Sequence, residues 1–97
     1  ERAPQTDAVF CSSDLLALGV LTEAQARRID VPAQLAIVGF GDLEFAADVH
    51  PALTSVHIKG AEIGRQAARF ILDRVENGDK APRVVDIGFS IIERQTT

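Results

Sequence analysis

Small and polar residues follow two apolar segments of the sequence at corresponding positions. Ser13 and Asp14 come after a first β-prone run, and Gly41 and Asp42 come after a second. A hydroxyl and a carboxylate can hydrogen-bond a ligand, and a carboxylate can also hold a metal ion or accept a phosphoryl group. In a parallel sheet, ligands bind just beyond the carboxyl ends of the strands. The pattern therefore predicts a small-molecule site at one edge of such a sheet.

Two predicted strands and a helix between them must position these residues. Residues 7–11 and 35–40 are apolar and β-prone, and residues 15–28 carry a broad apolar stripe at helical spacing. Strand, helix and strand in this order predict two parallel strands joined by a crossover helix. Gly19 costs this helix about 1 kcal/mol relative to alanine, so we expect another backbone to approach it closely.

The second half of the chain predicts further elements of the same kind. A short helical turn over residues 43–47 ends before His50-Pro51, and residues 53–58 alternate as an ambiguous strand. Residues 60–76 form the clearest amphipathic helix, which Asn77-Gly78 ends. Residues 85–91 alternate between apolar and polar types, as in a strand with one polar face.

Composition excludes several function classes. The 97 residues carry a formal net charge of −4 with no basic stripe, which excludes a nucleic-acid surface in this part of the chain. No apolar run approaches the roughly 20 residues of a membrane span. The single Cys11 allows no internal disulfide, and no signal peptide is recognisable, so we expect a cytoplasmic protein. His50 and His57 lie outside any ligand cluster, and no nucleophile motif occurs, so we predict no metal, no cofactor and no enzyme activity.

Several short motifs occur in a characteristic order along the chain. They are Ser13-Asp14 with Leu-Leu-Ala-Leu-Gly, Val31-Pro32, Ile-Val-Gly-Phe-x-Asp42, Pro51-x-Leu-Thr-Ser-Val and Gly64-Arg-x-Ala-Ala. Together they make the chain, from about Asp7 to Arg94, resemble the C-terminal part of a bacterial transcription regulator of the lactose/galactose-repressor (LacI/GalR) family. The resemblance implies an α/β fold: part of a periplasmic-binding-protein-like (type I) core, a parallel sheet flanked by helices.

The resemblance also implies a domain organisation. The family joins an N-terminal helix-turn-helix head, which binds DNA and is absent here, to a two-lobed effector-binding core. Residues 7–58 then belong to the C-terminal lobe, residues 60–78 form a helix of the N-terminal lobe, and residues 83–94 return as a strand. Residues near Lys59 and over 79–82 are expected to lie at hinges.

The effector-binding residues implied by the resemblance are Ser13, Asp14, Gly41, Asp42 and Ile58. Ser13 takes the place where many family members use Asn to bind a sugar hydroxyl, and Gly41 takes the place of the first of two acids. The missing carboxylate favours an anionic effector such as a sugar acid over a neutral sugar. The run from Gly39 to Phe45 resembles the gluconate-type regulators of the family, which implies gluconate as the effector. Two structural interpretations stay open: Ser13 and Asp14 could cap a helix, and Asp42 could be a turn residue.

Family members pair through their C-terminal lobe, which predicts a homodimer. The matching interface residues in this chain are Leu18, Leu21, Phe45 and Val49.

The alternative function is a receiver-type or nucleotide-binding signalling domain, in which Asp14 or Asp42 accepts a phosphoryl group or binds a metal and Lys59 is the charge partner. Such a domain needs a cluster of acids after the first strand, whereas Asp7 precedes that strand.

Overall fold

The computed structural model describes residues 5–78 and 82–97, in two compact units. The first unit contains the chain up to His57 together with Ser90–Thr97, and the second contains Ile58–Phe89. In chain order the elements are β1 (Ala8–Phe10), α1 (Asp14–Ala26), β2 (Ala36–Phe40), the 3₁₀ helix η1 (Glu44–Ala47), β3 (Thr54–Ile58), α2 (Gly60–Asn77) and β4 (Phe89–Ile92). No helix of the described ranges is both long and apolar enough to span a bilayer.

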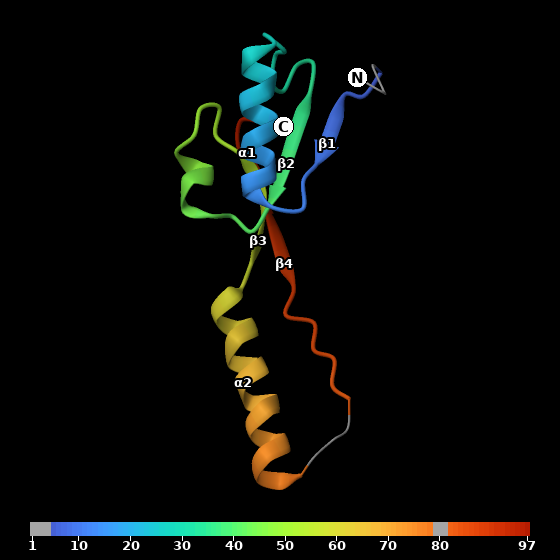
Figure 1. Ribbon diagram of the computed structural model, residues 1–97, viewed down its shortest axis with the longest axis vertical. Helices are drawn as coiled ribbons and strands as arrows, with labels where there is room; N and C mark the ends of the chain where they lie inside the picture. Colours follow the sequence, from blue (N-terminus) through green and yellow to red (C-terminus); the bar gives the residue numbers. More distant parts are fainter. Residues whose placement is uncertain (1–4, 79–81) are drawn as a thin grey trace. The chain divides into compact units, whose positions relative to one another are not determined.

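The strands form one sheet in the order β1-β2-β3-β4. β1 pairs with β2 and β2 pairs with β3, both in parallel, with Val9 opposite Ile37 and Gly39 opposite Ser55. β4 runs back beside β3 in the opposite direction, so the sheet is mixed (Figure 1). The predicted parallel sheet and its crossover helix are therefore confirmed for the first three strands.

Helix α1 lies against the sheet (Figure 1). Its buried residues recur at intervals of three or four, which places them on one side of the helix: Asp14, Ala17, Leu21 and Ala24. Ala17 and Leu21 join Ile37 of β2 and Leu53, which directly precedes β3, in the core of the first unit. The helix begins after Ser13, whose extended backbone and side-chain oxygen cap it by accepting the Leu16 N–H.

Two expectations about local structure are wrong. Among residues 5–78 and 82–97, no atom outside its own helix lies within 4 Å of the Cβ position of Gly19, so no other backbone of these residues packs against it. The strand expected over residues 85–91 begins only at Phe89. Apolar alternation produces a half-buried strand when a neighbouring layer covers its apolar face. Here Phe89 is 68% exposed and Ile91 63% exposed, so such a cover is missing among the described residues.

The second unit is built on α2, an amphipathic helix with no buried residue. Arg83 packs its guanidinium 5.3 Å from the centre of the Phe70 ring and pairs with Asp73 at 2.9 Å. The helix ends at Gly78, which adopts the left-handed conformation with φ of 67° that favours glycine. The hinge expected over residues 79–82 falls, except for Pro82, outside the described residues.

Candidate functional site

A tight turn follows β2 at the sheet edge where the sequence predicts a ligand. Gly41 and Asp42 both have positive φ, 117° and 53°, a region open to glycine and, less often, to aspartate. Three successive backbone N–H groups of this turn are bound from within the unit. Gly41 donates to the Val56 carbonyl at 2.9 Å, Asp42 to Ser55 Oγ at 3.0 Å and Leu43 to Asp14 Oδ2 at 2.7 Å. The turn is thereby attached to both β3 and α1.

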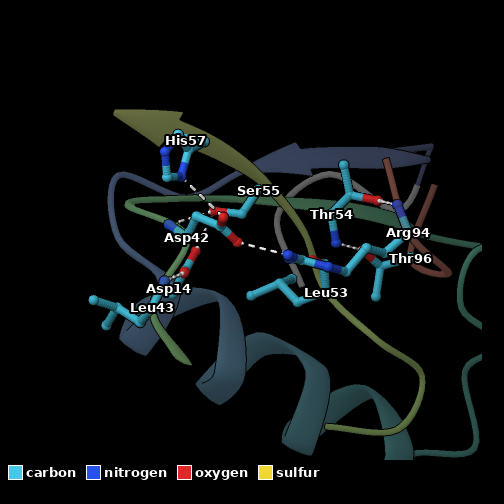
Figure 2. A network of polar contacts seen from close by, with 9 residues as sticks. All are labelled: Asp14, Asp42, Leu43, Leu53, Thr54, Ser55, His57, Arg94 and Thr96. Carbon is cyan, nitrogen blue, oxygen red and sulfur yellow. Dashed lines mark hydrogen bonds and ion pairs between the residues drawn. The ribbon is translucent and has the colours of Figure 1, made fainter. Parts of the chain in front are cut away.

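Asp14 and Ser55 form the buried base of this arrangement (Figure 2). Both are 0% exposed, and the Ser55 hydroxyl donates to Asp14 Oδ1 at 2.7 Å while its oxygen accepts the Asp42 N–H. The carboxylate lies directly over Gly39 of β2, where a Cβ atom would collide with Asp14 Oδ1. Gly39 is therefore needed at this point of β2 for steric reasons.

The Asp42 carboxylate is held by an arginine and a histidine side chain. Its Oδ1 accepts from Arg94 Nη2 at 2.8 Å, and its Oδ2 lies 3.0 Å from His57 Nδ1. The Asp42 and Arg94 side chains are only 15% and 18% exposed, whereas His57 is 47% exposed. Burial alone raises the pKa of Asp42, but hydrogen bonds and charge from Arg94 and His57 outweigh it and hold this pKa below its usual value.

Arg94 is a member of the site that the sequence gives no sign of. It lies 52 positions from Asp42, in the segment after β4, and no local motif links the two. Its Nη1 donates to the Leu53 carbonyl at 2.7 Å, and its backbone N–H donates to Thr54 Oγ1 at 2.8 Å. The nearby Thr96 hydroxyl, which is buried, donates to the Ile37 carbonyl at 2.6 Å. The last residues of the chain thus fasten Arg94 against β2 and β3 (Figure 2).

The predicted ligand contacts occupy different environments. Ser13 is half-buried and caps α1, while Gly41 and Asp42 are half-buried in the turn. Asp14 has no exposed surface and both of its oxygens accept hydrogen bonds, so it supports the site and offers no atom to a ligand. Ile58, half-buried, is the last residue of β3 and belongs to the second unit.

The predicted dimer contacts are also placed by the structure. Leu18, Phe45 and Val49 are half-buried, whereas Leu21 is 2% exposed in the core and has no surface for a second copy. An open, mainly apolar groove runs along α1 between Leu16, which is 57% exposed, and Arg27. The neighbouring Leu15 is 65% exposed. The exposed part of α1 is therefore more apolar than a solvated helix face needs to be.

Outside the polar network, the described residues offer neither a reactive thiol nor a cluster of metal ligands. Burial raises the pKa of the Cys11 thiol, which is 7% exposed, so a reactive thiolate is disfavoured. Residues 5–78 and 82–97 contain no cluster of three His, Cys, Asp or Glu side chains that could hold a metal ion. The site can therefore present three groups to a polar ligand: the Gly41–Leu43 turn, the paired carboxylate of Asp42 and the helix cap at Ser13.

Sequence comparisons place the chain among known proteins. The sequence model of one protein family, the periplasmic binding protein-like domain, matches residues 1–97. The HTH-type transcriptional regulator IdnR of Escherichia coli (strain K12) is 38% identical over 93 residues, which is 96% of this chain and 28% of that protein. The chain thus spans less than a third of the length of this relative.

Solved structures agree with the sequence match. A complex of the transcriptional regulator CelR with cellobiose superposes with a TM-score of 0.90 at 33% identity, covering 99% of this chain and 29% of that one. The transcription regulator GntR from Chromobacterium violaceum superposes with a TM-score of 0.81 at 41% identity, covering 96% and 34%. Both superpositions therefore cover nearly the whole chain.

Proposed function

Because the chain belongs to the periplasmic binding protein-like family of LacI-type transcription regulators, we propose that it works as part of the effector-sensing core of such a regulator. The receiver-type alternative fails at its phosphoacceptor. Asp14 is fully buried with both oxygens bonded, and Asp42 is bound by Arg94 and His57. Neither carboxylate has an oxygen free of these contacts to accept a phosphoryl group.

The proposed effector is a sugar acid of the gluconate type. The observation that carries this proposal is the charge of the turn. Gly41 brings no carboxylate, and the one at Asp42 is neutralised by Arg94 at 2.8 Å and approached by His57 at 3.0 Å. An anion placed at the turn meets no exposed carboxylate without a cationic partner, and the Asp14 carboxylate below it is buried with both oxygens hydrogen-bonded, so repulsion adds little to the anion's desolvation cost. CelR, which is captured with the neutral sugar cellobiose, shows that this fold also accepts uncharged ligands.

The remaining effector contacts and the DNA-binding part are proposed to lie outside these 97 residues. The relatives are HTH-type regulators more than three times as long as this chain. Ser13, Gly41 and Asp42 supply one wall of the pocket in this proposal. Residues up to Ile58 belong to the C-terminal lobe and α2 to the N-terminal lobe, and effector binding shifts the equilibrium between lobe arrangements.

We further propose a homodimer formed through the exposed face of α1 and the region of η1. Leu18, Phe45 and Val49 keep accessible surface there, and Leu15 and Leu16 extend the apolar area. An isologous contact would bury this surface on both copies at once. Pairing of this kind would hold two DNA-binding heads at a fixed spacing, as a palindromic operator requires.

The regulatory proposal is tested with the complete gene product and fragmented genomic DNA of its source. Fragments retained by the immobilised protein are sequenced, and the affinity for the retained site is measured by fluorescence anisotropy with gluconate or glucose present. We expect specific retention and an affinity that changes at least several-fold with gluconate and not with glucose. Absence of any specifically retained fragment would contradict the regulatory role, and a response to glucose alone would contradict the effector class.

A further inference from the structure

The buried pair Asp14–Ser55 is polar without being part of any proposed ligand contact. Both side chains are 0% exposed. Burying a charged carboxylate is unfavourable unless its oxygens are hydrogen-bonded. Asp14 meets this condition with two short bonds, from the Ser55 hydroxyl and the Leu43 N–H, both 2.7 Å long. Its burial therefore depends on the turn being in the conformation observed.

The geometry connects the two loops that carry the proposed effector contacts. Asp14 is the first residue of α1 and follows the cap Ser13 directly, so its position and that of Ser13 are set together. Its Oδ2 binds Leu43, which follows Gly41 and Asp42. Through this one carboxylate, the helix cap and the turn are held at a fixed separation.

Ser55 completes the connection because its hydroxyl group donates one hydrogen bond and accepts another. It donates to Asp14 Oδ1 and accepts the Asp42 N–H at 3.0 Å. Alanine at this position would remove both bonds and leave the Asp42 N–H and one Asp14 oxygen without these partners. Both groups are at or near the buried base of the turn, where an unmade hydrogen bond is costly.

We propose that Asp14 and Ser55 are positioning residues, which set the Gly41–Leu43 turn against the Ser13 cap and so hold the effector site in its binding conformation. This inference rests on the proposed effector-sensing function and goes beyond it, because it assigns effector affinity to two side chains that the effector does not touch. Gly39 contributes to the same positioning, because only a residue without Cβ leaves room for the Asp14 carboxylate.

The test compares Ser55→Ala with a core variant, Ile37→Val, in the complete gene product. Ile37 is fully buried in β2, and its side chain takes no part in the polar network, so its shortening lowers stability without touching the turn. Gluconate affinity is measured by calorimetry, and exchange of the backbone amides of residues 41–43 by NMR. A second variant, Asp14→Asn, keeps the shape of the side chain but leaves a single acceptor oxygen. In the observed arrangement it cannot accept hydrogen bonds from both the Ser55 hydroxyl and the Leu43 N–H.

We expect Ser55→Ala to weaken gluconate binding by about tenfold and to speed amide exchange at residues 42 and 43 by a similar factor, as expected for the loss of buried hydrogen bonds. Ile37→Val should leave both quantities unchanged within about twofold. Equal binding by the wild type and Ser55→Ala, or equal exchange at the turn, would overturn the inference. If Ser55→Ala is too unstable to measure, Asp14→Asn decides by the same two readouts.

The two proposals fail in different ways. If the wild type binds no sugar or sugar acid while both network variants speed amide exchange at the turn, the effector proposal fails and the positioning of the turn stands. If the wild type binds gluconate and the variants bind it equally well, the sensing function stands and the positioning role is refuted.

Discussion

Replacing Asp42 with asparagine tests whether the ion pair with Arg94 stabilises the first unit. Asparagine keeps an oxygen that can accept from the guanidinium, so the substitution removes charge with little change of shape. Breaking a fully buried pair costs about 3–5 kcal/mol, and an exposed pair contributes about 0–1 kcal/mol. With side chains 15% and 18% exposed and a distance of 2.8 Å, we expect Asp42→Asn to lower the free energy of unfolding by about 2 kcal/mol at pH 7.

The pH dependence of this loss gives the prediction its sharper form. The partners of Asp42 hold its pKa below the usual value in the folded chain. Its stabilising contribution is therefore fully present above the unfolded-state pKa of about 3.9 and is lost as pH falls through the lower folded pKa. The difference in unfolding free energy between wild type and Asp42→Asn should shrink as pH falls below about 4.

The assay is urea denaturation followed by circular dichroism, at pH 7 and at pH 3, for wild type, Asp42→Asn and the control Asp48→Asn. Asp48 is exposed, so the control removes the same charge from a solvated position. We expect the control to differ from wild type by less than about 0.5 kcal/mol at pH 7. A loss of equal size at both pH values, or one no larger than that of the control, would refute the ion-pair argument.

Three further outcomes follow from the packing. Gly39→Ala should destabilise the chain by about 3 kcal/mol, because the new Cβ meets the Asp14 carboxylate. Gly19 has open space around it, so Gly19→Ala should stabilise α1 by about 1 kcal/mol. Thermal unfolding of both variants checks this contrast, and equal effects would contradict it. Leu18→Arg should convert a dimer to a monomer in sedimentation measurements at tens of micromolar, and a monomeric wild type would reject the proposed interface. Because burial raises the pKa of Cys11, its alkylation at pH 8 should be slower than that of a free thiol by at least about tenfold until urea unfolds the chain, and equally fast labelling would show that the thiol is accessible.

The order of elements and the edge that carries the site could be predicted because their causes are local. Apolar runs of strand length, a helical stripe between them and the cap at Ser13 are all properties of neighbouring residues. From these, the carboxyl end of β2 follows as the place of the turn with Gly41 and Asp42.

The hydrogen bonds and the ion pair of the site could not be predicted, because they join residues that meet only after folding. Arg94 reaches Asp42 across 52 positions, and Ser55 reaches Asp14 across 41. A single sequence contains no local signal for either pair. Asp14 shows the consequence: next to a helix cap it suggests an exposed acid, yet it is fully buried because Ser55 and the turn supply its hydrogen bonds.

The error at residues 85–91 has a different origin. The alternation of apolar and polar residues is present, but only Phe89–Ile92 is a strand, and the apolar side chains Phe89 and Ile91 are mostly exposed. The alternation of apolar and polar residues indicates which face of a strand could be buried. Whether that face is paired depends on a neighbouring layer, which the alternation itself does not describe.

Calorimetric titration of the complete gene product with gluconate and with glucose tests the central claim most directly. Gluconate is an open-chain carboxylate and glucose a neutral ring, so their affinity ratio reports whether the site formed at Gly41 and Asp42 prefers a sugar acid to a neutral sugar. The account predicts binding of gluconate at least about tenfold tighter than that of glucose. Equal affinities, or tighter binding of glucose, would contradict it.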